Sequence, residues 1–302
     1  MSDALVLFGT EVRRCLSRRV VWVLVGLAGI GIVAASILTF LNTGDDGAAE
    51  RERAVRQCVQ FEDGPRARVE ARCREMIPPD AFDNRLRLTD LWPEGRDEGD
   101  RVLGVTVVFL AIGALLGGAS MVGGDWKAGT MATLLTWEPR RVRLAVARFA
   151  AVVVLAMGIG LALQLLLILG LLPSVLAHGT TEGADASWWV SLAGGLFRCQ
   201  VLTGLAALFG AAVAMIGRNT AAAMGAAFAY MLIGENLVRA WKPWLRPWLL
   251  AENAFIFLSG YTPAEAGIGR GFGAAAVTLV LYVVGLAAVA TALFHRRDVA
   301  TT

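Results

Sequence analysis

The chain has 302 residues, of which 56% are hydrophobic and 18% are charged, and its mean hydropathy is +0.60. A soluble domain of this length would need more polar surface, so the composition excludes an ordinary soluble protein and indicates a membrane protein. The formal net charge is only +3, so the charges matter by their positions along the chain rather than by their sum.

Six apolar segments are expected to cross the membrane. A spanning helix needs about 20 mainly apolar residues to cross a hydrocarbon core of about 30 Å, and only the fifth segment is clearly shorter. The sequence therefore predicts an all-α, polytopic membrane fold. The expected spans are residues 20–41, 102–122, 149–172, 188–216, 220–234 and 272–294. The expected connections are residues 1–19, 42–101, 123–148, 173–187, 217–219, 235–271 and 295–302.

The first apolar segment has two readings, because several arginines precede it as they would precede a secretory signal peptide. The apolar core of a signal peptide is about 7–15 residues long. The stretch from 20 to 41 is longer than that, so an uncleaved first span is favoured over a cleaved signal.

Arginines flank one set of span ends. They are Arg13, Arg14, Arg18, Arg19, Arg140, Arg141, Arg143, Arg148, Arg218, Arg296 and Arg297. Basic residues in short flanks mark the cytoplasmic side. We therefore expect both termini in the cytoplasm and a multi-pass protein of the cell inner (plasma) membrane.

The long connection at 42–101 is then an outer loop, and it contains Cys58 and Cys73. An oxidising compartment permits a disulfide between them, which would stabilise the loop by about 3 kcal/mol in the chain-entropy account. Two unpaired thiols are the alternative, and the bridge is favoured. We expect the loop to form a small cap, either as a solvated decoration or as a contact surface for a substrate or outer partner.

The polar connector at 123–148 is expected to contain two helices separated by Pro139. Asp125 is a plausible N-cap for the first, which would cover residues 130–137. Its positions Met131, Leu134 and Leu135 form one apolar face. That face would be exposed for a soluble partner to bind, or the connector would lie on anionic headgroups through its arginines. The residues alone favour neither reading.

Arg198 is the strong charge within an expected span. Such a charge should face protein or a water-filled path, not lipid. We expect Glu235 as its partner, with Gln164 and Gln200 completing a polar cluster. The cluster either locks the fourth and fifth spans together or lines a translocation path. The small residues from 113 to 117 allow close helix approach, within the chain or in a dimer.

Sequence signals for catalysis are missing. Neither lysine, Lys127 or Lys242, is followed by Ser or Thr, so there is no Walker A motif. The histidines His178 and His295 lack Cys or carboxylate partners at ligand spacing, which predicts no metal site. We expect no enzymatic activity and no bound cofactor in this chain.

The connector resembles that of the membrane subunits of type-2 ATP-binding-cassette (ABC) exporters, which reads acid, three residues, Gly-Thr, Leu-Leu, Pro and a basic residue. Here the acid is Asp where Glu is usual, and one more residue precedes the proline than in many members. The matching residues are Asp125, Gly129, Thr130, Leu134, Leu135, Thr136, Pro139, Arg140 and Arg141, with Arg148 at a further basic position. Residues 11–22, EVRRCLSRRVVW, look like the family's amphipathic elbow helix, and residues 235–271 like its re-entrant helices.

The resemblance implies a six-span permease that pairs with a second copy or a sister permease. It also implies two copies of a cytoplasmic ABC ATPase, which would bind ATP and Mg²⁺, and contact with membrane lipid but no nucleic acid. The connector would be the coupling helix. Its contact residues would be Asp125, Gly129, Thr130, Met131, Leu134, Leu135, Pro139, Arg140 and Arg141. The alternative is a polytopic sensing or interaction protein without transport, and a channel is a weaker third.

Overall fold

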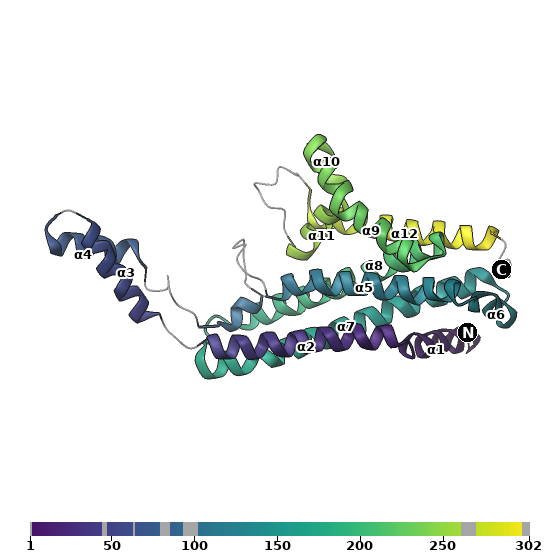
Figure 1. The fold of residues 1–302 in the computed structure, drawn as a ribbon, viewed down its shortest axis with the longest axis horizontal. Helices are drawn as coiled ribbons and strands as arrows, with labels where there is room; N and C mark the ends of the chain where they lie inside the picture. The colour runs from purple at the N-terminus through teal and green to yellow at the C-terminus, as the bar shows by residue number, and fades with distance from the viewer. Residues whose placement is uncertain are drawn as a thin grey trace.

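The structure is a computed structural model that describes residues 2–43, 47–62, 64–78, 85–92, 102–260 and 270–297. This described part is helical, without a strand of regular sheet; Arg87 and Thr180 form one isolated bridge. Six of its helical segments are long and apolar enough to cross a membrane. The prediction of an all-α fold with six candidate spans is therefore confirmed, and the chain is that of a multi-pass membrane protein (Figure 1). The six candidate spans are α2 (Arg19–Asn42), α5 (Val102–Lys127), α7 (Arg141–His178), α8 (Ala186–Gly217), the segment Thr220–Trp241 that begins with α9 (Thr220–Ala229), and α12 (Phe272–Arg296).

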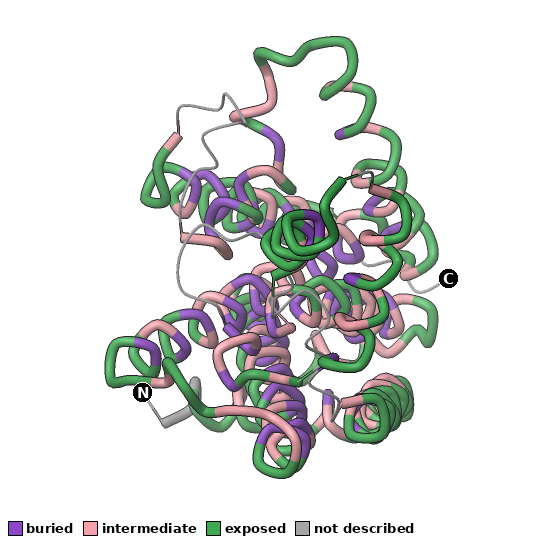
Figure 2. The backbone as a smooth tube through the Cα atoms, turned by 90° about the vertical axis from the view of Figure 1, so that its left-hand side faces the viewer, coloured by how far each residue is buried: buried purple, intermediate pink, exposed green. Residues whose placement is uncertain are grey.

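Helix α8 is the centre of the bundle. In its most apolar window 61% of the residues are buried, against 11% for α2. Glycines on both helices let α5 and α8 pack closely. A Cβ on Gly118 of α5 would overlap the carbonyl of Ala207 in α8, and a Cβ on Gly210 of α8 would overlap the carbonyl of Leu115 in α5. Figure 2 shows buried positions inside the bundle and exposed ones around its outside, as expected for helices that face lipid.

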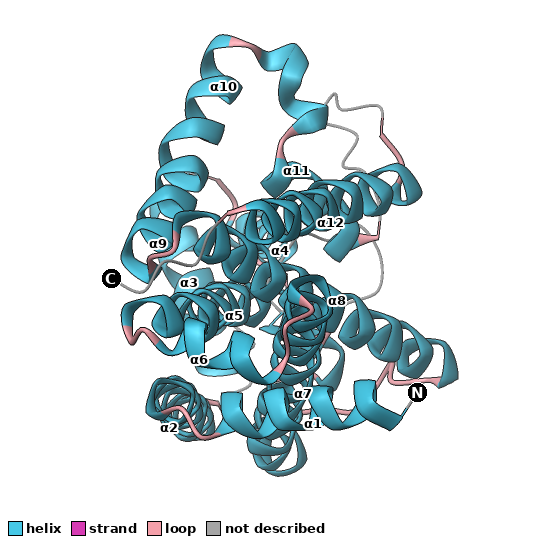
Figure 3. Cartoon of the chain, turned by 90° about the vertical axis from the view of Figure 1, so that its right-hand side faces the viewer, coloured by secondary structure: helices cyan, strands magenta, loops and turns pink. Residues whose placement is uncertain are grey.

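One end of the bundle, here called the α6 end, carries two short helices. α1 (Ser2–Leu16) crosses this end beside the start of α2, and α6 (Thr130–Trp137) connects α5 to α7 (Figure 3). α12 also ends here, where Arg141 donates hydrogen bonds to the carbonyls of Phe294, His295 and Arg297.

The opposite end carries a helical hairpin, α3 (Ala48–Phe61) and α4 (Arg66–Met76), which lies apart from the bundle (Figure 1). The predicted disulfide joins Cys58 to Cys73 across this hairpin. The short 3-10 helix η1 (Leu88–Leu91) instead packs onto the bundle. There the indole nitrogen of Trp188 donates to the carbonyl of Trp92 at 2.9 Å, and both rings are buried.

The fifth candidate span is longer than the predicted 220–234. α9 continues through a π-helical turn, η2 (Tyr230–Gly234), into α10 (Glu235–Trp241), because no proline interrupts the helix before Pro243. The chain then turns through the 3-10 helix η3 (Pro243–Trp248) into α11 (Leu250–Ser259). The α10 segment, at the top of Figure 2, is mostly exposed.

Candidate functional site

The candidate site is a cluster of charged side chains at the α6 end, centred on Asp125. Asp125 lies in the last turn of α5 and is 3% exposed. The prediction that it caps the connector helix is wrong, because α5 continues through it to Lys127. The N-cap of α6 is Gly129, whose φ of 67° is in the left-handed region that glycine adopts without strain. Asp125 instead accepts a hydrogen bond from the hydroxyl of Thr130 at 3.2 Å.

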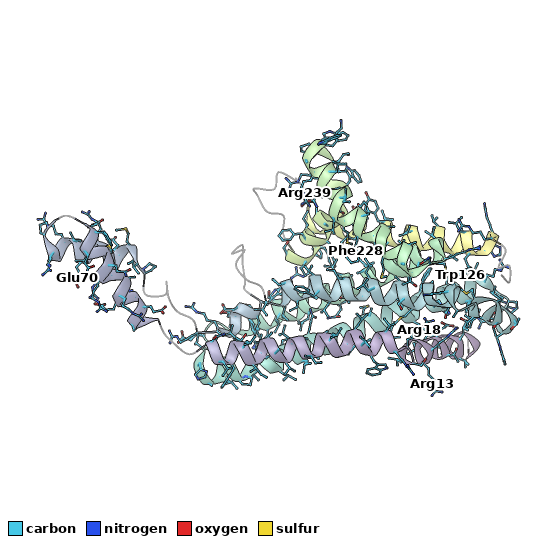
Figure 4. All side chains as sticks on the ribbon, viewed as in Figure 1. Arg13, Arg18, Glu70, Trp126, Phe228 and Arg239 are labelled. Carbon is cyan, nitrogen blue, oxygen red and sulfur yellow. A yellow bond between two sulfur atoms is a disulfide. The ribbon has the colours of Figure 1, made fainter. Side chains whose placement is uncertain are left out.

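Three arginines surround the Asp125 carboxylate. Arg148 of α7 contacts it at 2.5 Å, Arg14 of α1 contacts it at 3.1 Å, and Arg18, between α1 and α2, also pairs with it. Arg148 in addition pairs with Glu11 of α1 at 3.2 Å. The cluster therefore joins α1, α5, α6 and α7. Figure 4 shows Arg18 beside this end, while Arg13 points away from the bundle.

The cluster is buried as well as charged. The side chains of Arg148 and Asp125 are 2% and 4% exposed, whereas those of Arg14 and Arg18 are 29% and 23% exposed. Two carboxylates and three guanidinium groups leave a net charge of +1 (3 − 2). Removing one member of a buried ion pair typically costs about 3–5 kcal/mol, so the cluster fixes the relative positions of these helices.

Cys15 lies next to the cluster and is 4% exposed. Burial, reinforced by the nearby Glu11 carboxylate, raises the pKa of its thiol to about 11. The thiolate is the reactive form of cysteine, so Cys15 stays protonated at neutral pH and is a packing residue. Within the described ranges, no three His, Cys, Asp or Glu side chains gather as a metal site requires.

The apolar face of α6 points inward. Met131 is 2% exposed, and Leu134 and Leu135 are half-buried against the same core. The predicted exposure is therefore wrong for Met131, and Leu134 and Leu135 are partly covered, because this face packs against the apolar core at the α6 end. The outward face carries Trp137, which is 85% exposed.

Some of the residues after α6 are exposed to solvent, and others contact the rest of the chain. Pro139 and Arg140 are exposed. Arg141 is half-buried because its guanidinium caps the end of α12, and this contact competes with the predicted role in binding a partner. Arg143 pairs with Glu138 at 3.8 Å.

The predicted intramembrane cluster is only partly assembled. Gln164 and Gln200 are hydrogen-bonded to each other at 2.5 Å, but Arg198 and Glu235 do not form an ion pair with each other in the described structure. Glu235 accepts the backbone N–H groups of Leu250 and Ala251 at the start of α11. Arg198 lies over the ring of Trp92, at 5.5 Å, and beside Gly260 just after α11 ends. The two ends of this ten-residue helix are about 15 Å apart, which keeps the two side chains separate.

Glu11 is a member of the site that was not predicted from the sequence. A usable signal was present, because Glu11 is an acid within an arginine-rich segment and lies three residues before Arg14. An acid in that position is expected to have a structural partner, and Arg148 is the partner found.

Comparison with known protein families finds no match for this sequence, and comparison with curated proteins finds none either.

Proposed function

We propose that this chain is the membrane-spanning permease subunit of an ATP-driven exporter of the type-2 ABC class. In this proposal α6 is the coupling helix that contacts a separate cytoplasmic ATPase, and the α6 end is the cytoplasmic end. The observation that carries the proposal is the construction of α6. It is an eight-residue helix beyond the candidate spans that exposes Trp137, and its first residue, Thr130, is hydrogen-bonded to the buried, ion-paired Asp125.

The ion-pair cluster connects α6 to the spanning helices α5 and α7 through a series of contacts. Thr130 begins α6 and is hydrogen-bonded to Asp125, which is itself paired with Arg148 of α7. Asp125 and Arg148 are buried and lose their partners if they separate. Because α6 follows Asp125 in the chain and is hydrogen-bonded to it, we expect a displacement of α6 to act on the ends of α5 and α7. A helix that transmits motion from an ATPase needs this kind of rigid attachment.

The ATPase itself would be a second polypeptide. The chain has no Walker A motif, so ATP and Mg²⁺ would bind to the partner, of which two copies would meet a permease dimer. The dimer would contain a second copy of this chain or a sister permease. In this arrangement α1 corresponds to the elbow helix and α11 to a re-entrant helix of the family.

Trp137 is the residue we expect to anchor the partner. Large aromatic side chains dominate the binding energy of many interfaces, and truncating one commonly costs about 2 kcal/mol or more, which is on the order of thirtyfold in affinity. Leu134 and Leu135 are unsuitable targets for a test, because they pack against the core of the chain and changing them to Asp would also disturb the fold.

The experiment is co-purification of the tagged chain with a nucleotide-hydrolysing subunit from its native membranes. Trp137→Ala should weaken the complex about thirtyfold. Trp241→Ala is the matched control, because Trp241 is 76% exposed but belongs to α10, and this variant should keep the complex. If no ATPase co-purifies with the wild-type chain, or if Trp137→Ala keeps the complex intact, the coupling role of α6 is wrong.

A polytopic sensing protein is the second candidate, and the α3–α4 hairpin favours it. The hairpin has its own small core of Val55, Val69 and Cys73, is closed by a disulfide and lies apart from the bundle. Deleting residues 47–78 separates the two functions. A transporter should keep its ATPase complex after this deletion, whereas a sensor that binds its ligand through the hairpin should lose its outer partner.

A further inference from the structure

Two exposed tryptophans lie where the chain turns back after the fifth candidate span. Trp244 and Trp248 belong to η3, and both are more than half exposed. Basic residues lie close to them in sequence, at 239, 242 and 246. Residues 239–252 are here called the η3 turn. In Figure 1 the chain leaves the bundle along α9 and α10 and returns along α11, so this turn lies away from the bundle.

The fifth candidate span carries the η3 turn to the membrane surface opposite the α6 end. The span starts at the α6 end, where Thr220 lies against Gly123 of α5. It runs from Thr220 to Trp241, which is 22 residues or about 33 Å by helical rise. Since the hydrocarbon core is about 30 Å thick, the residues that follow Trp241 lie at the opposite surface.

The start of α12 places the turn at the same level. Arg270 lies two residues before α12, and its Cζ is 4.6 Å from the centre of the Trp248 ring. Arg270 also donates hydrogen bonds to the carbonyl of Pro247 and, at 2.7 Å, to the hydroxyl of Thr278 in α12. Because α12 ends at the α6 end, its first turns lie at the opposite surface, and the η3 turn is fixed beside them.

The described residues from 230 to 260 and from 270 to 278 carry more positive than negative charge. Four cations and two carboxylates leave a net charge of +2 (4 − 2). They are Arg239, Lys242, Arg246 and Arg270 against Glu235 and Glu252. The buried Glu235 accepts backbone N–H groups at the start of α11, so the cations of the η3 turn have Glu252 as their counter-charge.

Glu252 holds two arginines of the turn together. Its Oε1 lies 3.1 Å from Arg239 Nε and accepts from Arg246 Nε and Nη2 at 3.2 and 3.1 Å. The Glu252 side chain is 11% exposed, whereas those of Arg239 and Arg246 are 41% and 32% exposed. Their other guanidinium N–H groups have no partner among the described residues, and neither does the exposed ammonium of Lys242. One carboxylate balances one guanidinium, so a further anion is favoured here.

We propose that the η3 turn binds the phosphate of an anionic phospholipid in the leaflet opposite the α6 end. Guanidinium groups form strong, charge-assisted hydrogen bonds to phosphate, and Glu252 fixes the two arginines that would make them (Figure 4 labels Arg239). Tryptophan is enriched at the level of the headgroups, which favours a lipid over a soluble anion. A zwitterionic lipid brings its own cation and fits the net charge less well. The proposal does not depend on the proposed transport function.

The test compares two photoreactive lipids in nanodiscs of phosphatidylcholine that contain the purified chain. One is phosphatidylglycerol and the other is phosphatidylcholine, each with a diazirine at the same acyl carbon near the headgroup, and the adducts are mapped by mass spectrometry. The phosphatidylglycerol probe should label residues 235–259 at least about fivefold more than its partner, the factor that one basic residue contributes near an anionic headgroup. Concentrated salt should reduce this ratio toward one, because it screens exposed charges.

Three variants define the site. Lys242→Gln should lower labelling by phosphatidylglycerol about fivefold and leave labelling by phosphatidylcholine unchanged. Arg239→Gln should act in the same way, and this variant keeps the ion pair of Arg246 with Glu252 that holds the turn. Lys127→Gln is the matched control, because Lys127 is the other lysine of the chain, is exposed and ends α5 at the α6 end. Labelling of the η3 turn should not change in this control.

Equal labelling by the two probes would overturn the proposal, as would phosphatidylglycerol labelling that Lys242→Gln and Arg239→Gln leave intact. Labelling spread evenly over both ends of the bundle would also overturn it. Excess glycerol phosphate or an oligoglutamate peptide should not displace the probe. If either does, the ligand is a soluble anion or an acidic protein segment and the lipid assignment is wrong. No ATPase is present in these measurements, so this proposal and the proposed function can fail independently.

Discussion

Replacing Asp125 tests whether the buried cluster holds the α6 end together. Asp125→Asn removes the charge that three arginines share while keeping the size of the side chain. Arg14 and Arg18 are partly exposed and regain hydration, so most of the cost comes from Arg148, which is 2% exposed and keeps only Glu11. We expect a loss of about 3–5 kcal/mol. At about 2–4 °C per kcal/mol, the midpoint of thermal unfolding should fall by roughly 6–20 °C.

The assay is thermal unfolding of the purified chain in detergent, followed with an intrinsic-fluorescence probe. Asp125→Glu keeps the charge and should recover most of the loss. The matched control is Glu138→Gln, which breaks a 3.8 Å pair whose side chains are 28% and 20% exposed and should cost no more than about 1 kcal/mol. If Asp125→Asn is as mild as this control, the cluster does not carry the stability assigned to it.

Two further predictions concern thiols and acid. Cys15 and Cys199 are buried, so the native chain should react with no maleimide at pH 7, with two equivalents after denaturation, and with four after denaturation and reduction. Labelling of the native chain would contradict the burial. The backbone N–H of Trp188 holds the pKa of Asp185 below its ordinary value of 3.8, so stability from this cap is present above about pH 4 and is lost below it. Unfolding midpoints of Asp185→Asn should change less between pH 6 and pH 3 than those of the wild type; an equal change would refute the assignment.

The number and type of the spanning helices could be predicted because they depend on local composition. A run of about 20 apolar residues predicts a membrane helix wherever its neighbours lie. The limits of the fifth span could not be predicted, because its continuation beyond Gly234 depends on a π-helical turn and on Glu235 binding the start of α11. Those contacts join residues that are 15 and 16 positions apart, and periodicity does not detect them.

The residues that form the apolar face of the connector could be identified from the sequence. Whether that face points toward solvent or toward the bundle could not be predicted. An apolar face at Met131 was correctly identified, yet whether it is exposed depends on which helix ends lie next to it. The same limit applies to Arg198, for which Glu235 was a reasonable partner in sequence. Pairing between distant helices is decided by tertiary packing, and the structure places these two side chains at opposite ends of α11.

The placement of α1 explains how Glu11 and Arg14 reach the cluster. α1 has an inner side, where Glu11 and Arg14 enter the cluster, and an outer side, where Arg13 is exposed. The inner side of α1 is held by ion pairs with Asp125 and Arg148. If the end of α5 is displaced, the Asp125 carboxylate must either carry α1 with it or lose its ion pairs. The second outcome costs several kcal/mol, so the cluster holds α1 to the ends of α5 and α7.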